Sequence, residues 1–214
     1  MAMKLRTPFK LSLSLLCLLS LAAFLRADDS DQKSVLTSTD KVVGLKQTAK
    51  AKPNVLSAPG DYGGDGNDEP PASAIDGDTN TKYFNHVQDG TETPGVNTGL
   101  VVTPTAGPTI VTAIQFAAAN DVEGRDPVKI TLEGSNDPKA TEAGAKDFAV
   151  VYEGPSGLEI DPGRTTFGKV ITFDNKVAYQ SYRLLITATR ATDADSTQYA
   201  EVKLLGKAAP AAKP

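Results

Sequence analysis

Val128-Lys129-Ile130-Thr131-Leu132-Glu133 alternates apolar with polar side chains and runs directly into Gly134-Ser135-Asn136-Asp137-Pro138. Alternation at a period of two puts the apolar side chains on one face of an extended segment, which is typical of a half-buried β-strand. Clustered Gly, Asn, Asp and Pro are typical of the turn that ends such a strand. This stretch therefore predicts an all-β fold.

Similar apolar patterns recur along much of the chain. The predicted strands cover 100–102, 110–116, 128–133, 148–152, 169–173, 182–188 and 201–204. Within the second of these we expect Ile110, Ile114 and Phe116 to share one buried face. No long segment has the periodicity of a helix. About eight short strands with turn-rich connections predict an eight-stranded antiparallel jelly-roll β-sandwich.

The sandwich accounts for most of the 214 residues. We expect residues 1–27 to be a signal peptide, 28–53 a flexible lead-in, 54–206 the β-sandwich and 207–214 a disordered tail. The lead-in is polar, although Val42-Val43-Gly44-Leu45 could add a short element, and the tail contains only Ala, Pro and Lys.

The N-terminus has the layout of a secretory signal peptide. Lys4, Arg6 and Lys10 form a positive region, Leu11–Leu25 is apolar, and cleavage is expected after Ala27. The apolar stretch is shorter than the ~20 residues of a membrane-spanning helix, which favours cleavage over a retained anchor. We therefore expect a mature protein that is secreted or held in the periplasm or cell envelope, with no stable membrane span.

Composition excludes several classes of function. The single cysteine, Cys17, lies in the predicted signal peptide and follows Leu16, where a lipoprotein signal has a small residue, so we exclude lipidation. The mature chain then has no disulfide, no thiol catalyst and no cysteine-ligated metal. Removing the four positive charges of the signal changes the formal net charge from −4 to −8, which disfavours binding to nucleic acid and to anionic membranes.

One segment concentrates oxygen donors of the kind that calcium prefers: Ala72-Ser73-Ala74-Ile75-Asp76-Gly77-Asp78-Thr79-Asn80-Thr81-Lys82-Tyr83. An EF-hand loop beginning at Asp76 does not fit. Thr81 stands at its sixth position, where Gly is needed, and Val87 at its twelfth, where a bidentate Glu belongs. The EF-hand is therefore excluded, and the segment needs another explanation.

Three motifs follow one another along the chain. They are Ala74-Ile75-Asp76-Gly77-Asp78 with Thr81-Lys82-Tyr83, Thr131-Leu132-Glu133-Gly134-Ser135-Asn136-Asp137, and Ala200-Glu201-Val202-Lys203-Leu204-Leu205-Gly206. Together they resemble the discoidin family, the coagulation-factor-5/8 type C domains, whose galactose-binding-like fold also includes family 32 carbohydrate-binding modules. The resemblance spans about Asn54 to Gly206 and implies a jelly-roll sandwich that in many members holds a structural calcium ion.

The resemblance implies a calcium site that joins a loop to the last strand. Its ligands would be the Ser73 carbonyl, the Asp76 carboxylate, the Asp78 carbonyl, the Thr81 oxygens, the Ala200 carbonyl and the Glu201 carboxylate. Such a metal would tie two distant segments together and stabilise the sandwich. The alternative interpretation is that Asp76 and Asp78 form Asx turns without a metal.

The resemblance also implies a sugar site in the loops beside Tyr83-Phe84-Asn85-His86, because sugar-binding relatives use His, Arg, Asn and an aromatic side chain there. Tyr83, Asn85 and His86 are the candidate contacts, and His86 is the only histidine in the chain. The chain has no tryptophan, however, and so lacks the best stacking surface for a sugar ring.

Arg125 is a fourth candidate contact. It stands in Asn120-Asp121-Val122-Glu123-Gly124-Arg125-Asp126-Pro127, where it could bind a carboxylate or be presented to a ligand. The alternative is that Arg125 pairs with Asp121 or Asp126 and fixes this loop. For the Gly- and Asp-rich segment 61–69, we expect a solvated loop, with a second calcium site as the alternative.

An enzyme is not expected. A catalytic triad would have to use His86, and no Gly-x-Ser-x-Gly motif is present. Two functions stay open, since fold does not decide function. One is a secreted module that binds extracellular or cell-surface carbohydrate. The other is a structural or protein-interaction (adhesion) module of the cell envelope, with an envelope protein as its partner and no sugar site.

Overall fold

A computed structural model of the chain describes residues 33–47, 54–58, 61–62, 68–86 and 95–210. The predicted signal peptide, 1–27, lies outside these residues. Within the described part of the chain, no helix is long and apolar enough to cross a membrane.

Strands dominate the described residues, which contain no α-helix. The strands are β1 (Lys33–Ser34), β2 (Lys41–Leu45), β3 (Tyr83–His86), β4 (Thr98–Thr103), β5 (Thr109–Ala117), β6 (Pro127–Ser135), β7 (Ala149–Pro155), β8 (Ile171–Thr172), β9 (Ser181–Thr189), β10 (Ser196–Tyr199) and β11 (Glu201–Ala208). Two 3-10 helices, η2 (Pro71–Ala74) and η3 (Glu123–Arg125), lie between them. The described residues hold eleven strands where about eight were expected, because β1, β3 and β10 are too short to show alternation in the sequence.

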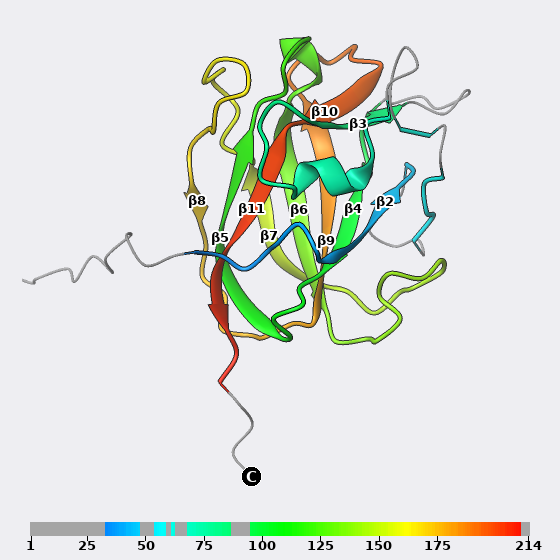
Figure 1. Cartoon of the computed structure of the whole chain (residues 1–214), viewed down its shortest axis with the longest axis vertical. Coiled ribbons are helices and arrows are strands. Elements are labelled where there is room, and N and C mark those ends of the chain that lie inside the picture. Colours follow the sequence, from blue (N-terminus) through cyan, green and yellow to red (C-terminus); the bar gives the residue numbers. More distant parts are fainter. Residues whose placement is uncertain (1–32, 48–53, 59–60, 63–67, 87–94, 211–214) are drawn as a thin grey trace, which may run out of the picture. The chain divides into compact units, whose positions relative to one another are not determined.

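The strands form an antiparallel β-sandwich, as the sequence predicts (Figure 1). One sheet has the order β1-β11-β5-β8 and the other the order β2-β4-β9-β6-β7. A separate two-stranded ribbon pairs β10 with β3. All three sheets join strands that are distant in sequence, so their pairing depends on the packed core rather than on local turns.

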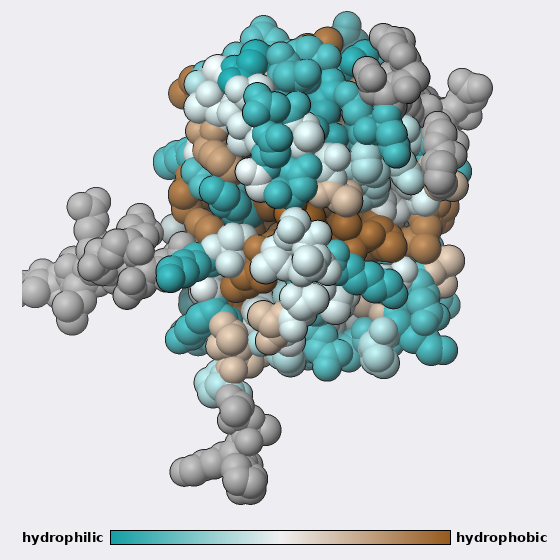
Figure 2. All heavy atoms as spheres, viewed as in Figure 1, coloured by the Kyte–Doolittle hydropathy of each residue, from teal (hydrophilic) through white to brown (hydrophobic). Residues whose placement is uncertain are grey.

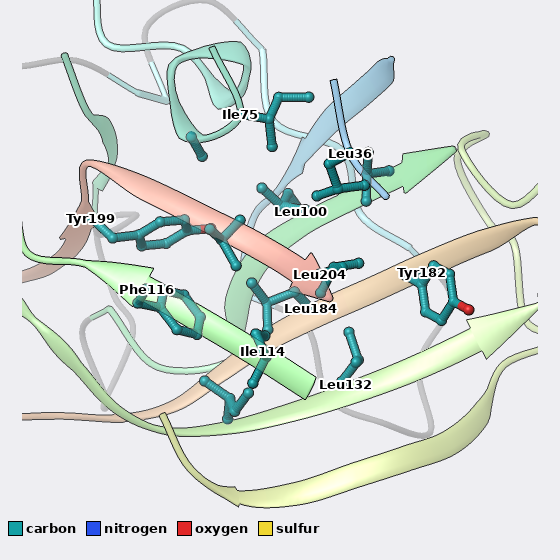
Figure 3. Packing of buried hydrophobic residues seen from close by; sticks show 14 of the residues in the cluster. Leu36, Ile75, Leu100, Ile114, Phe116, Leu132, Tyr182, Leu184, Tyr199 and Leu204 are labelled. Atoms are coloured by element: carbon teal, nitrogen blue, oxygen red, sulfur yellow. The ribbon is translucent and has the colours of Figure 1, made fainter. Parts of the chain in front are cut away.

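Apolar side chains from the two larger sheets meet in a single main core (Figure 3). Leu100, Leu132 and Leu184 come from the five-stranded sheet, and Ile114 and Leu204 come from the four-stranded sheet. The alternation predicted for β6 and β9 is confirmed on this inner face for the buried residues Ile130, Leu132, Tyr182, Leu184 and Ile186. Val128 and Ala188, at the ends of the pattern, are only half-buried.

Strand β5 departs from strict alternation. The pairing of β5 with β11 shifts register, which makes Thr112 the extra residue of a β-bulge. Val111, Ile114 and Phe116 therefore join the core, whereas Ile110 is only half-buried. The expected common face is correct for Ile114 and Phe116 and wrong for Ile110.

The outer face of the five-stranded sheet is covered as well. Leu45, Val101, Ala140 and Leu185 form a smaller apolar cluster there, with Phe148 packed against it. Thr131 and Glu133 of β6, which simple alternation predicts to face solvent, are consequently buried, whereas Lys129 is exposed.

Glu133 forms an ion pair with the buried Arg183 of β9. Nε of Arg183 donates to Oε2 of Glu133 at 2.7 Å, and its Nη1 donates to Oδ1 of Asn54 at 2.7 Å. The guanidinium carbon also lies 4.0 Å from the centre of the Phe148 ring. The pair thus fixes β9, β6 and the segment that begins at Asn54.

Residues 33–45, expected to belong to a flexible lead-in, contribute a strand to each large sheet. β1 pairs with β11, and β2 pairs with β4. Between the two strands, Leu36 enters the core, and Asp40 accepts hydrogen bonds from the backbone N–H groups of Thr37 (3.0 Å) and Thr105 (2.9 Å). The sandwich therefore includes residues from Lys33 onward, upstream of the expected boundary at Asn54.

Candidate functional site

The β3–β10 ribbon lies at one end of the sandwich (Figure 1). Its register places His86 opposite Ser196. Because successive side chains in a strand point to opposite faces, Tyr83 and Asn85 share one face of the ribbon and Phe84 lies on the other. The two faces have different surroundings.

Tyr83 and Asn85, two of the candidate sugar contacts, are buried on the inner face. The Tyr83 hydroxyl donates to the Gly99 carbonyl at 3.1 Å, and Nδ2 of Asn85 donates to the Leu45 carbonyl at 2.8 Å. Tyr199 packs edge-on against Tyr83, with ring centres 5.7 Å apart. These side chains hold the ribbon against the sandwich. Because Tyr83 and Asn85 are buried, they are not part of the candidate ligand site.

His86 is the last residue of β3. Its side chain and the following residues, 87–94, lie outside the described part of the chain. The backbone register nevertheless places His86 beside the start of β10, which directly follows Asp195. The structure therefore brings the position of His86 next to Asp195, a residue that the sequence did not single out.

Arg125, the fourth candidate, forms a two-pronged ion pair with Asp195. Nε of Arg125 lies 2.9 Å from Oδ1 and Nη2 lies 3.2 Å from Oδ2. The guanidinium also covers the ring of Phe84, 5.0 Å from its centre. The expectation that Arg125 pairs with Asp121 or Asp126 is wrong, because both carboxylates are bound by other cations.

The Arg125–Asp195 pair is open to solvent. The side chain of Arg125 is 24% exposed and that of Asp195 is 70% exposed. A hydrogen bond from the Ser196 hydroxyl, together with Arg125, keeps the pKa of Asp195 below its ordinary value even though partial burial raises it. At neutral pH the pair therefore presents an ionised carboxylate beside a guanidinium.

Lys82 binds Asp121 on the outer face of the ribbon. Nζ of Lys82 lies 2.8 Å and 2.9 Å from the two carboxylate oxygens, 3.2 Å from Oε1 of Gln198 and 3.5 Å from Oε1 of Glu69. Burial raises the pKa of Asp121, but the hydrogen bonds from Lys82 and Gln198 outweigh it, and the net shift is downward. This cation is thus fully engaged.

Asp126 is fully buried and joins two arginines. Nη1 of Arg164 lies 3.0 Å from Oδ1, and Nη2 of Arg190 lies 3.2 Å from Oδ2. The same two arginines donate to the backbone carbonyls of Asp121, Glu123, Leu158 and Glu159. We call Asp126, Arg164 and Arg190 the arginine hub, because it fixes loops 118–126, 156–164 and 189–195 to one another.

The predicted calcium residues also lie close together. The backbone N–H of Gly77 donates to Oε1 of Glu201 at 2.7 Å, across 124 residues of sequence. The hydroxyl of Thr81 lies 2.7 Å from Oδ2 of Asp76 and 2.9 Å from the carbonyl oxygen of Asp78. The loop after η2 therefore lies against the start of β11, as the resemblance implies.

Asx turns are present in this loop. Oδ1 of Asp76 accepts from the backbone N–H of Asp78 at 2.8 Å, and Oδ1 of Asp78 accepts from that of Asn80 at 2.9 Å. The Asx turns expected in the alternative interpretation are therefore confirmed. These turns do not prevent metal binding, because a carboxylate oxygen that accepts one hydrogen bond keeps a second lone pair.

Glu201 is a buried acid beside another acid. Burial, together with the neighbouring carboxyl of Asp76, raises its pKa to about 7, against the opposing hydrogen bond from Gly77. Its neighbours in β11, Val202 and Leu204, are core residues, so the Glu201 side chain is directed to the other face. Two adjacent carboxyl groups, one of them buried, are an environment that a bound cation would stabilise.

The remaining predicted ligands contribute backbone atoms. Ser73 lies in η2, and Ala200 is buried directly before β11. Among the described residues, no three or more His, Cys, Asp and Glu side chains cluster so that they could hold a metal. The implied calcium shell would instead combine two carboxylates with carbonyl and hydroxyl oxygens. In the Gly- and Asp-rich segment, Asp61 binds Lys46 at 2.8 Å.

Comparison with known proteins gives a fold but no close relative. No protein-family model matches the chain, and no curated protein sequence matches it. Solved structures do match. A family 32 carbohydrate-binding module of Clostridium perfringens NanJ, solved with galactose, is 14% identical with a TM-score of 0.52, covering 81% of this chain and 98% of that one.

Two further modules from Clostridium perfringens agree. One, solved in complex with GalNAc-β-1,3-galactose, is 14% identical with a TM-score of 0.54, covering 81% of this chain and 99% of the other. Another, from a family 31 glycoside hydrolase, is 15% identical with a TM-score of 0.52, covering 75% and 94%. The chain therefore has the discoidin-like β-sandwich fold, also called galactose-binding-like, that these family 32 carbohydrate-binding modules share.

Proposed function

We propose that the protein is a non-catalytic carbohydrate-binding module whose ligand site lies at the outer end of the β3–β10 ribbon. The observation that carries the proposal is the solvent-open Arg125–Asp195 pair beside the backbone position of His86. We assign ligand contact to these three residues.

The chemistry of the pair suits a sugar. Neighbouring hydroxyl groups of a sugar ring each offer a donor and an acceptor, and a guanidinium next to a carboxylate complements both. Because Arg125 already packs on Phe84 and binds Asp195, its side chain is ordered before a ligand arrives, which lowers the entropic cost of binding. The fold likeness supports the proposal, since the matched modules were solved with galactose and with GalNAc-β-1,3-galactose.

A broad glycan array, probed with the mature protein, tests this function. We expect binding to at least one class of carbohydrate, with loss of binding in Arg125→Ala and Asp195→Asn. Asp174→Asn is the matched control, because Asp174 is 83% exposed and lies after β8, away from the ribbon. No binding to any glycan would sink the proposal and favour the second function, an adhesion or scaffold module that recognises an envelope protein.

We also propose that calcium stabilises the module. The supporting observation is the buried Glu201 carboxyl beside Asp76, with the carbonyl of Asp78 and the hydroxyl of Thr81 adjacent. Ser73 and Ala200 would add backbone carbonyls. The ion would be structural, because this loop belongs to the junction of η2 with β11 and none of its residues belongs to the proposed sugar site.

Export is the final part of the proposal. It rests on the sequence of residues 1–27 and makes the mature module extracellular or periplasmic, where polysaccharides and cell-surface glycans are found. Comparing the N-terminal residue of the secreted protein with Asp28 would test the expected cleavage position directly.

A further inference from the structure

Gln198 is a polar side chain on the outer face of the β3–β10 ribbon and is not one of the three assigned ligand contacts. It lies opposite Phe84 in the ribbon register, and it is fully buried. The end of the molecule where Figure 1 labels β10 is mainly hydrophilic on the face that Figure 2 shows. The Gln198 amide takes no part in that surface, so a ligand that arrives from solvent does not touch it.

The amide of Gln198 binds the loop that leads into η3. Its Nε2 donates to Oδ1 of Asp121 at 2.8 Å, to the carbonyl oxygen of Asp121 at 3.2 Å and to that of Val122 at 3.1 Å. Its Oε1 accepts from Nζ of Lys82 at 3.2 Å. Because a buried amide is costly unless its donors and acceptors are paired, these contacts fix the loop against β10.

The carbonyl group of Val122 connects Gln198 to Arg125. The same carbonyl oxygen accepts the backbone N–H of Arg125 at 3.0 Å, at the single turn of η3. Gln198 and the backbone of Arg125 therefore share one acceptor, which its two lone pairs allow. A shift of this carbonyl would move the backbone from which the Arg125 side chain extends.

The other end of Arg125 is held by the strand partner of Gln198. The guanidinium lies 5.0 Å from the centre of the ring of Phe84, which is buried opposite Gln198. Asp195, which binds the guanidinium through both carboxylate oxygens, directly precedes β10. The backbone of Arg125, its guanidinium and its acidic partner are thus all positioned by the β3–β10 ribbon.

Resting on the proposed function, we infer that Gln198 is a positioning residue for ligand binding. It acts through Val122 and holds Arg125 in the place where the guanidinium and Asp195 together meet the sugar. Holding the side chain there before binding lowers the conformational entropy that is lost when the ligand binds. Gln198 therefore contributes to affinity although the ligand never touches it.

Two variants remove the donor of Gln198 without emptying its place. Gln198→Met keeps a side chain of similar length and has no N–H. Gln198→Glu keeps an acceptor for Lys82, but its carboxylate cannot donate to Val122, so either variant that folds carries the test. The control is Leu36→Ala, which truncates a core residue between β1 and β2. Circular dichroism establishes that each variant is folded under the conditions of the measurement.

The NMR signal of the Arg125 Nε–H reports the positioning without any ligand. This proton is hydrogen-bonded to Asp195 in the natural protein, and Arg125→Lys identifies the signal by removing it. We expect its exchange with water to become about tenfold faster in both Gln198 variants, because the contact between Arg125 and Asp195 opens more often. Leu36→Ala should leave the rate unchanged.

Calorimetry then measures affinity, and its probe is the glycan that gives the natural protein the strongest signal on the array described above. Both Gln198 variants should bind this glycan about tenfold more weakly, and Leu36→Ala should bind it as the natural protein does. Unchanged affinity, or weaker binding with an unchanged Arg125 signal, would overturn the inference and leave the carbohydrate function intact. Failure of the natural protein to bind any glycan would overturn the proposed function itself.

Discussion

Arg183 and Glu133 lie directly opposite each other on β9 and β6, and their side chains form a buried ion pair with Nε 2.7 Å from Oε2. Removing one member of such a pair leaves an uncompensated charge in a low-dielectric environment. We expect Glu133→Ala to lower the free energy of unfolding by about 3–5 kcal/mol. Urea denaturation followed by circular dichroism measures this.

Two comparisons sharpen that result. The exposed Asp174–Lys176 pair is the control, and Asp174→Ala should cost no more than about 0.5 kcal/mol. The double variant Glu133→Ala with Arg183→Met should regain part of the loss, because no unpaired charge remains. If Glu133→Ala matched the control, the buried pair would have no role in stability.

Calcium should raise the melting temperature of the mature protein. A ligand that binds only the folded state adds about 2.7 kcal/mol at a hundredfold excess over its Kd, which corresponds to a rise of about 5–10 °C for a domain of this size. Differential scanning fluorimetry with a chelator and then with added calcium checks it. A melting temperature that changes neither with the chelator nor with added calcium would rule out the proposed metal.

Glu201→Gln should abolish that calcium response. The amide keeps an acceptor for the backbone N–H of Gly77 but removes the buried charge beside Asp76. Without calcium, we therefore expect this variant to be at least as stable as the natural protein, since adjacent carboxylates no longer repel. A calcium response of natural size in the variant would move the metal away from Glu201.

Leu36→Ala should destabilise the sandwich although it lies in the segment expected to be flexible. Leu36 is buried against the main core between β1 and β2, and truncating a buried leucine costs about 2–5 kcal/mol. Val177→Ala is the control, because Val177 is half exposed after β8. Equal stability of the two variants in urea would show that residues 33–45 do not complete the core.

Asp40 should give a pH-dependent contribution to stability. Burial raises the pKa of Asp40, but the hydrogen bonds from Thr105 and Thr37 lower it by a larger amount. The pKa in the folded state therefore lies below the ordinary 3.8. A lowered pKa in the folded state stabilises the protein above pH 3.8 and loses that effect as the pH falls through the folded value. Asp40→Asn should therefore cost about 1 kcal/mol at pH 7 and progressively less below pH 4.

That prediction is checked by urea denaturation of both proteins across the acidic range. Thr39→Ala serves as the control, because Thr39 lies in the same turn and is exposed. A difference between Asp40→Asn and the natural protein that stays constant with pH would show that the carboxylate charge is irrelevant to the turn.

Local pattern predicted the fold class because strand alternation is a local property. Period-two spacing in β6 and β9 predicts which face of each strand is buried, and the central apolar residues of both strands are buried on that face. The bulge at Thr112 escaped prediction because it depends on pairing with β11, nearly a hundred residues later. Likewise, β1 is defined by its partner β11 and has too few residues to show a period, whereas the apolar residues 42–45 did indicate the short element that is β2.

The candidate sites were also predictable only where their residues are close in sequence or belong to a motif. Asp76, Asp78 and Thr81 are neighbours in sequence, so their approach could be expected, and the motif at Glu201 supplied the distant partner. Arg125 gives no local sign that its partner is Asp195, 70 residues away. Burial of Tyr83 and Asn85 followed from which face of the ribbon packs inward, which sequence alone does not settle.

The arginine hub has a consequence for how this protein can change. Arg190 holds its loops largely through main-chain carbonyl oxygens, which every amino acid possesses, and Arg164 adds a hydrogen bond to the carbonyl of Asp121. Side chains at the tips, such as Val122 and the 85% exposed Ile160, take no part in that grip. Their identity can therefore vary without loosening the frame, which makes this end a template for diversifying recognition, by evolution or by directed libraries.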